Sequence, residues 1–124
     1  MPIKKKNQQK RILIVEDEKP IAQTLGLKLF HQGYEIVHAY DGDEALALLE
    51  KHSFDLLLLD IIMPNTDGFE VLRSLKKSTP VFVLTNLCQE EDAAICKKLG
   101  AQRFFVKSET SLSDVVHHIN AFFA

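Results

Sequence analysis

One short apolar run, Leu56-Leu57-Leu58-Leu59 between Asp55 and Asp60, constrains the fold more than any other feature of this 124-residue sequence. A strand with one face in water alternates apolar and polar residues, whereas a run without alternation is typical of a parallel strand covered on both faces. The shortness of the run and the proline at position 64 argue against a helix. We therefore predict a central strand over Asp55–Leu59.

Four other apolar runs, mostly β-branched, have a similar length, and segments with helical periodicity separate them. The expected strands are Ile12–Val15, Glu35–Ala39, Asp55–Leu59, Val81–Leu84 and Arg103–Val106, and the expected helices are Lys19–His31, Asp43–His52, Gly68–Lys77, Glu90–Leu99 and Leu112–Phe123. Each connection contains its own helix and is too long for a hairpin, which makes neighbouring strands parallel. The sequence therefore predicts an α/β fold, a doubly wound five-stranded parallel sheet with strand order 2-1-3-4-5, of the flavodoxin-like (βα)5 type.

Helix-capping signals support these boundaries. Asp41, Asp67 and Ser111 each precede an expected helix and are followed three positions later by an acidic residue, as in a capping box. Gly33 and Gly100 lie just past two of the helices, where a left-handed backbone favours glycine.

Composition excludes several classes of function. The net charge of −2 gives no indication of nucleic-acid binding, and Cys88 and Cys96 have neither disulfide nor zinc-ligand spacing. A basic stretch begins at Lys4, but the apolar run after it is too short for a signal peptide or a membrane span. We therefore expect a flexible basic tail over residues 1–10, one domain over residues 11–124, no membrane insertion and a cytoplasmic location.

Polar residues of a few chemical types follow four of the expected strands. Glu16 and Asp17 follow the first strand, Asp60 the third, Thr85 the fourth and Lys107 the fifth. Ligands of open parallel sheets bind at these carboxyl ends of the strands. Carboxylates about 5 Å apart would repel by roughly 3 kcal/mol per pair at an effective dielectric constant of about 20. Each residue alone has an ordinary structural explanation, but together they predict a Mg²⁺ site with a lysine beside it.

In these motifs the sequence resembles response-regulator receiver domains over residues 11–123. The matching segments are Ile12–Glu18, Leu57–Gly68, Val83–Thr85 and Gly100–Lys107. The resemblance implies that Asp60 is the phosphoacceptor and that Glu16, Asp17, Asp60 and the backbone carbonyl of Ile62 hold Mg²⁺.

The resemblance also implies how a signal is received and passed on. Thr85 and Lys107 would hold the phosphoryl oxygens, and Phe104 would be the switch aromatic whose rotamer follows Thr85. The expected donor is a histidine kinase or histidine phosphotransfer protein, and the output is a changed face of the last two helices and the strand between them. With no output domain in the chain, we expect a stand-alone module that acts on an unknown partner protein, is a monomer or weak homodimer, and is not an enzyme.

Two apolar residues are expected to set the lifetime of the phosphorylated state. Ile62 and Leu87 lie two positions after Asp60 and Thr85 respectively, where a side chain could orient or exclude an attacking water. Neither can form a hydrogen bond with water, so we expect a comparatively long-lived phosphoryl group.

Three residues depart from the family pattern. Glu16 stands where many members have aspartate, and its longer side chain is expected to reach the metal through water. Ser108 stands where proline is usual, so we predict a trans Lys107–Ser108 bond, because a cis bond before a non-proline residue costs roughly 3–4 kcal/mol. Asn86 occupies a position that is commonly small and could restrict access to the site.

Three other functions fit parts of the pattern. A flavodoxin-like FMN binder would need a phosphate loop rich in hydrogen-bond donors after the first strand, but an acidic Glu16-Asp17-Glu18 segment stands there. A hydrolase of the aspartyl-phosphate type would need an Asp-x-Asp nucleophile after that strand. A degenerate receiver used only for docking would lack some acceptor, metal or contact residues, and all of them are present.

Overall fold

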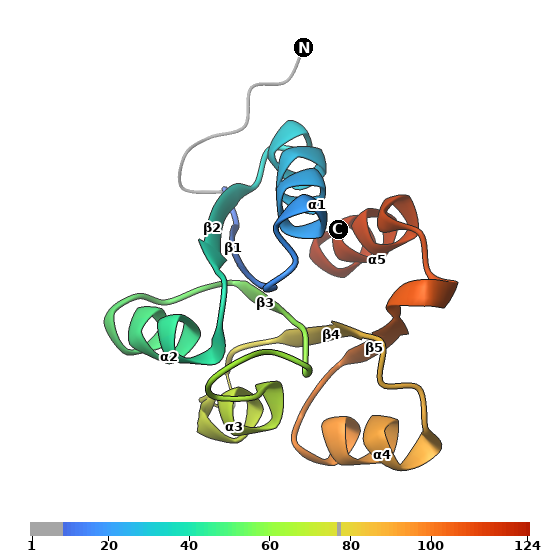
Figure 1. The fold of residues 1–124 in the computed structure, drawn as a ribbon. Helices are drawn as coiled ribbons and strands as arrows, with labels where there is room; N and C mark the ends of the chain where they lie inside the picture. The colour runs from blue at the N-terminus through green and yellow to red at the C-terminus, as the bar shows by residue number, and fades with distance from the viewer. Residues whose placement is uncertain (1–8, 77) are drawn as a thin grey trace.

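The computed structural model describes residues 9–76 and 78–124 and contains one parallel sheet (Figure 1). Its strand order is β2-β1-β3-β4-β5, so the predicted fold class and strand order are confirmed. The strands are β1 (Arg11–Val15), β2 (Glu35–Ala39), β3 (Leu56–Leu59), β4 (Val81–Thr85) and β5 (Arg103–Val106), and the helices are α1 (Lys19–His31), α2 (Gly42–Lys51), α3 (Gly68–Ser74), α4 (Glu90–Lys98) and α5 (Leu112–Phe123). All but Gln9 and Lys10 of the expected tail lies outside the described residues.

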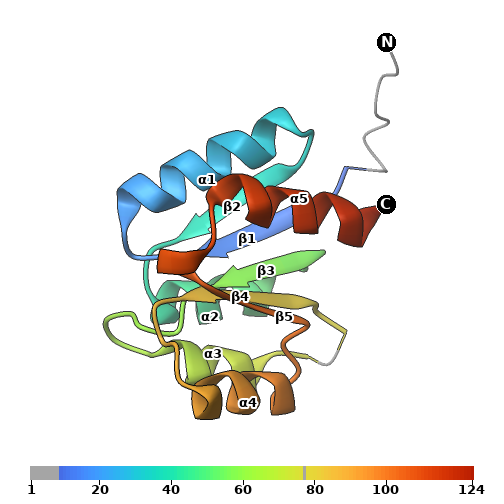
Figure 2. The same cartoon turned by 90° about the vertical axis from the view of Figure 1, so that its right-hand side faces the viewer.

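Helices cover both faces of the sheet, as the apolar run of β3 requires. Helices α1 and α5 lie on one face, and α2, α3 and α4 on the other (Figure 2). Leu56 and Leu58 belong to the core cluster under α1 and α5, while Leu57 and Leu59 belong to the cluster on the opposite face. All four side chains are at most 2% exposed, and each contributes roughly 2 kcal/mol of hydrophobic stabilisation.

The predicted caps are present. The side chains of Asp41, Asp67 and Ser111 accept hydrogen bonds from the N–H groups three residues later, at 2.8, 3.0 and 3.0 Å. Gly33 and Gly100 have φ values of 98° and 108°, in the left-handed region that terminates helices.

Helix α3 is shorter than predicted, because it ends at Ser74 rather than at residue 77. The Ser74 hydroxyl donates to the carbonyl of Glu70 at 2.9 Å, and Leu75 leaves the helix with ψ of 144°. Strand β3 begins one residue later than predicted, because the Asp55 carboxylate accepts from the N–H of Arg11 at 2.8 Å. Other boundaries shift by one residue, at the start of β1 and α2 and at the end of β4, α2 and α4.

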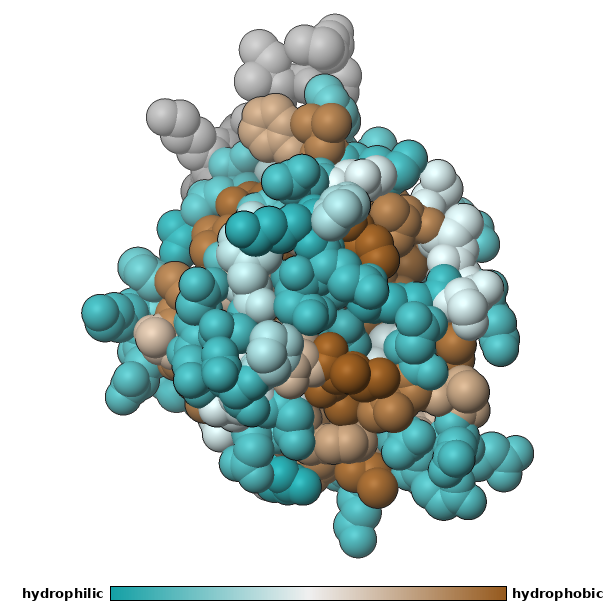
Figure 3. Space-filling view, viewed as in Figure 1, coloured by the Kyte–Doolittle hydropathy of each residue, from teal (hydrophilic) through white to brown (hydrophobic). Residues whose placement is uncertain are grey.

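The face of the molecule seen in Figure 3 is mostly polar, with separate apolar patches. Among the described residues, the exposed large hydrophobic side chains come from α1, the β3–α3 loop, α4 and α5, and they are Leu27, Phe30, Ile62, Ile95 and Phe122. Among the described residues, no helix combines the length and hydrophobicity that a membrane crossing requires.

Candidate functional site

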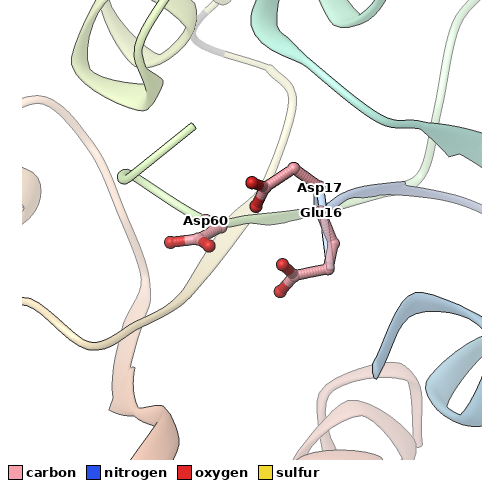
Figure 4. Close-up of side chains that lie close together, drawn as sticks. All are labelled: Glu16, Asp17 and Asp60. Carbon is pink, nitrogen blue, oxygen red and sulfur yellow. The ribbon is translucent and has the colours of Figure 1, made fainter. Parts of the chain in front are cut away.

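Three carboxylates lie together at the carboxyl ends of β1 and β3. Val15 pairs with Leu59 in the parallel register, so the residues that follow them, Glu16 and Asp60, lie side by side. Figure 4 shows the side chains of these two residues and of Asp17 close together. Carboxylate oxygens of the three residues lie within 4.8 Å of one another, so the group predicted from the sequence forms and could hold a metal ion.

Two of the three carboxylates are removed from solvent. Glu16 is 3% exposed and Asp60 is 4% exposed, whereas Asp17 is exposed. The backbone supplies part of their hydrogen bonding, because the N–H of Ile62 donates to Asp60 Oδ1 at 3.1 Å and the N–H of Glu18 donates to Glu16 Oε2 at 3.0 Å. Buried carboxylates are expensive unless they are paired, so the remaining oxygens need a cation.

Lys107, which follows β5, supplies one positive charge. Its Nζ lies 2.8 Å from Glu16 Oε1 and 2.8 Å from Asp60 Oδ2, and the lysine side chain is only 9% exposed. A third carboxylate, that of Glu18, lies 3.2 Å from the same Nζ. Lys107 therefore lies beside the acidic site, as predicted, and its ammonium joins the ends of β1 and β3.

The electrostatics of the group favour a further cation. Burial raises the pKa of the Glu16 carboxyl to about 7, against the opposing effect of its hydrogen bond from Lys107. For Lys107, burial alone would lower the pKa, but hydrogen bonds and charge from Asp60 and Glu16 outweigh it and hold the pKa above its ordinary value. The single ammonium of Lys107 contacts the carboxylates of Glu16, Glu18 and Asp60, and that of Asp17 lies close by. When these carboxylates are ionised, negative charge is left uncompensated, which favours a divalent cation with oxygen ligands.

The other predicted residues, apart from Ile62 in the β3–α3 loop, lie on the β4 and β5 side of the site. Thr85 ends β4 with no exposed surface, and its hydroxyl accepts from the N–H of Leu87 at 3.4 Å. Phe104 and Leu87 are half-buried and pack against the core cluster under α2, α3 and α4, while Ile62 is 53% exposed. Asn86 is exposed and joins two loops, because its Oδ1 accepts from the N–H of Ser108 at 3.2 Å.

Glu18 is a partner of Lys107 that the sequence does not predict. The sequence signal for this contact is the acidic segment Glu16-Asp17-Glu18, but only the bend after β1 turns the Glu18 carboxylate toward the lysine. The prediction for the Lys107–Ser108 bond is confirmed, because no cis peptide bond occurs in residues 9–76 and 78–124.

Comparison with known proteins now decides the family. The family model for the response regulator receiver domain matches residues 12–120, more than half of the chain. The chain belongs to the response regulator receiver domain family. Similar structures include the receiver domain of Francisella response regulator 1452, with 30% identity, a TM-score of 0.84 and coverage of 93% of this chain and 97% of that one.

Two further structures extend the comparison. A CheY-like receiver domain protein from Methanospirillum hungatei JF-1 has 29% identity and a TM-score of 0.86, with coverage of 93% of this chain and 94% of that one. The phosphorylated cyanobacterial phytochrome response regulator RcpA has 30% identity and a TM-score of 0.79, with coverage of 92% and 91%. The receiver domain described here therefore has a phosphoacceptor role in two-component signalling, as a signalling module rather than an enzyme of the usual kind.

Proposed function

We propose that Asp60 of this receiver domain accepts a phosphoryl group from a phosphohistidine of a histidine kinase or histidine phosphotransfer protein. The observation that carries the proposal is the placement of Asp60, a carboxylate 4% exposed that is held by Lys107 and lies next to two further carboxylates. No other aspartate of the described chain is buried.

The donor set fits Mg²⁺, which prefers a few carboxylates together with water and phosphate oxygens. The carboxylates of Glu16, Asp17 and Asp60 would hold it with the backbone carbonyl of Ile62, the ligand that the resemblance implies. When bound, Mg²⁺ supplies positive charge that offsets the negative charge of the transferring phosphoryl group.

The residues around Asp60 orient its carboxylate for attack. Ile62 donates an N–H to one oxygen, and Lys107 binds the other at 2.8 Å. In the proposed step a carboxylate oxygen forms a bond to phosphorus while the phosphorus–nitrogen bond of the phosphohistidine breaks and its electron pair stays on the imidazole. The ammonium of Lys107 then pairs with an oxygen of the transferred group, so its charge remains useful after the transfer.

Thr85 and Phe104 form the proposed output of the switch. The Thr85 hydroxyl accepts a long bond of 3.4 Å from Leu87, so its own hydrogen is available for a phosphoryl oxygen. Movement of Thr85 toward Asp60 would vacate space for Phe104, which is half-buried on β5. The face formed by α4, β5 and α5 would change as a result.

The proposal also covers the partner protein, the location and the oligomeric state. The partner is a protein that recognises the α4–β5–α5 face, with no direct nucleic-acid contact, no membrane insertion, a cytoplasmic location and a monomer or weak homodimer as the working form. The similarity to RcpA, whose crystal structure is of a phosphorylated protein, supports phosphorylation as the input.

The test uses the two aspartates that flank β3. The protein is incubated with Mg²⁺ and acetyl phosphate, and the intact mass is measured. We expect wild type to gain one phosphoryl group, Asp60→Asn to gain none, and the matched control Asp55→Asn, at the exposed end of β3, to behave as wild type. Chelation of Mg²⁺ should prevent the gain. An unchanged single-site adduct in Asp60→Asn would contradict the assignment.

A further inference from the structure

The start of α2 approaches the β3–α3 loop more closely than any side chain at that position would allow. A methyl group added at Gly42 would lie 1.7 Å from the carbonyl oxygen of Thr66 and 2.6 Å from its carbonyl carbon. These are backbone atoms, so alanine at this position would force the loop to move. Gly42 is the first residue of α2, and alanine is the better helix former, which means that close approach rather than helix formation explains the glycine.

Side chains reinforce this approach on both sides of Gly42. Asn65 Nδ2 donates to Asp41 Oδ2 at 3.1 Å, and the hydroxyl of Thr66 donates to the carboxylate of Asp43. Asn65 has φ of 65°, a left-handed conformation that asparagine tolerates better than most residues. We call these five residues, Asp41, Gly42, Asp43, Asn65 and Thr66, the α2 clamp.

The clamped loop begins at the phosphoacceptor. Ile62 donates its N–H to Asp60 Oδ1 at 3.1 Å, and the N–H of Gly68 donates to the carbonyl of Ile61 at 3.0 Å, which closes the loop at its base. The clamp therefore holds the part of the loop just before α3, while these backbone bonds hold the base of the loop. Between the two contacts lies Ile62, whose carbonyl is the backbone ligand in the proposed Mg²⁺ site.

We propose that the α2 clamp positions the carbonyl of Ile62 for Mg²⁺, which makes Gly42 a positioning residue for metal binding. The inference rests on the proposed function, since it concerns the metal of that same site. Metal ligands depend on the groups that orient them, and loss of such support typically costs about 10- to 100-fold in metal affinity. A small shift of the loop at Thr66 would carry Ile62 with it, because only three residues separate them.

The experiment is a calorimetric titration of the full chain with Mg²⁺, without a phosphodonor. Gly42→Ala should bind Mg²⁺ about 10-fold more weakly than wild type. Its phosphorylation by acetyl phosphate should be slow at low Mg²⁺ and return to the wild-type rate at saturating Mg²⁺. A purely structural defect would lower the rate at both concentrations.

Two further variants keep the test decisive. Gly100→Ala is the matched control, because it strains a positive φ of 108° with no atom within 4 Å of the added methyl group and lies outside the clamp. It should lose stability but keep the wild-type Mg²⁺ affinity. Asn65→Gly keeps the left-handed backbone and removes only the bond to Asp41, so it should weaken Mg²⁺ binding less than Gly42→Ala does, and it serves if that variant does not fold.

The outcomes separate the inference from the function on which it rests. Wild-type affinity in both Gly42→Ala and Asn65→Gly would overturn the role of the clamp while leaving phosphorylation of Asp60 in place. Weakening in Gly100→Ala equal to that in Gly42→Ala would also overturn it. Absence of Mg²⁺ binding by the wild-type protein would overturn the proposed metal site itself.

Discussion

Helices α3 and α4 lie on the same face of the sheet but are held very differently (Figure 2). Helix α3 is capped by the Asp67 side chain, buries Val71 and Leu72, and follows a loop tied to α2. Helix α4 follows Gln89, which makes no side-chain capping bond, and buries only Cys96. The α3 side of the site is therefore anchored by a cap, by buried side chains and by bonds to α2, whereas the α4 side has fewer such contacts.

This difference matches the two tasks of the proposed switch. Chemistry at Asp60 needs its oxygens and the Mg²⁺ ligands to stay in place, and Asp60 and Ile62 belong to the loop that leads into the anchored α3. Thr85 and Phe104 need to rearrange, and the loop after Thr85 leads into α4. Elements that move in signalling are drawn from the least stable parts of a fold, so α4 is where we expect the response.

Of the substitutions proposed here, replacing Lys107 with methionine should cause the largest loss of folding free energy. The substitution leaves Glu16 and Asp60 buried without their 2.8 Å partner, and removing one member of a buried ion pair typically costs about 3 kcal/mol or more of folding free energy. Urea unfolding in the presence of a chelator measures the loss, and Mg²⁺ should restore part of it. The control Lys98→Met, at the exposed end of α4, should unfold as wild type. Equal stability of the two variants would contradict the pairing.

The lifetime of the phosphoryl group probes both sides of the site at once. Ile62 comes from the anchored loop and Leu87 from the lightly held one, and Leu87 also packs against the core. Changing them together, as Ile62→Asn with Leu87→Glu, should admit and orient water and speed loss of the phosphoryl group by roughly 10-fold. Decay is followed by intact mass after removal of the donor. A double mutant that keeps its phosphoryl group as long as wild type would show that these side chains do not set the lifetime.

Replacing the residue before each of these two helices by alanine tests directly whether α3 and α4 are held unequally. Asp67→Ala deletes the 3.0 Å capping bond of α3 and should cost about 1 kcal/mol of folding free energy. Gln89→Ala deletes no capping bond and should stay within about 0.5 kcal/mol of wild type. Both values come from urea unfolding curves. If the two substitutions cost the same, the helices are not held unequally by their caps.

The smallest expected effect comes from giving α4 the cap that it lacks. Gln89→Ser places a hydroxyl oxygen where it can accept from an N–H group of the first turn, and should stabilise α4 by about 0.5 kcal/mol. Hydrogen exchange of the α4 amides should slow, while exchange in α3 stays unchanged. Slowing in α3 instead would mean that the two helices open together.

Much of the fold and the site could be predicted because both follow from strand periodicity. The unbroken apolar run of β3 predicted cover on both faces, and parallel pairing then placed Glu16, Asp60 and Lys107 at one edge. Boundaries of β2, β5, α1 and α5 match the predicted ones, and the Ser111 cap marks the start of α5 while Gly33, with its φ of 98°, lies just past the end of α1.

The features of the fold and the site that could not be predicted are a helix end and contacts between loops that are distant in the sequence. The end of α3 is set by the Ser74 hydroxyl, which competes for a helix carbonyl. The contact of Glu18 with Lys107 and the approach of Gly42 to Thr66 join segments that no periodic pattern links. Such contacts leave no local trace in the sequence beyond residue types that fit many roles.

The position of Lys107 late in the sequence determines when its ion pairs can form during synthesis. The lysine follows the fifth strand and binds Asp60, 47 residues earlier, and Glu18, 89 residues earlier. A chain emerging from the ribosome presents its acidic residues long before their counter-charge. Until β5 joins β4, Asp60 and Glu16 lack their ammonium partner, so the buried ion pairs of the site form only when the sheet is complete.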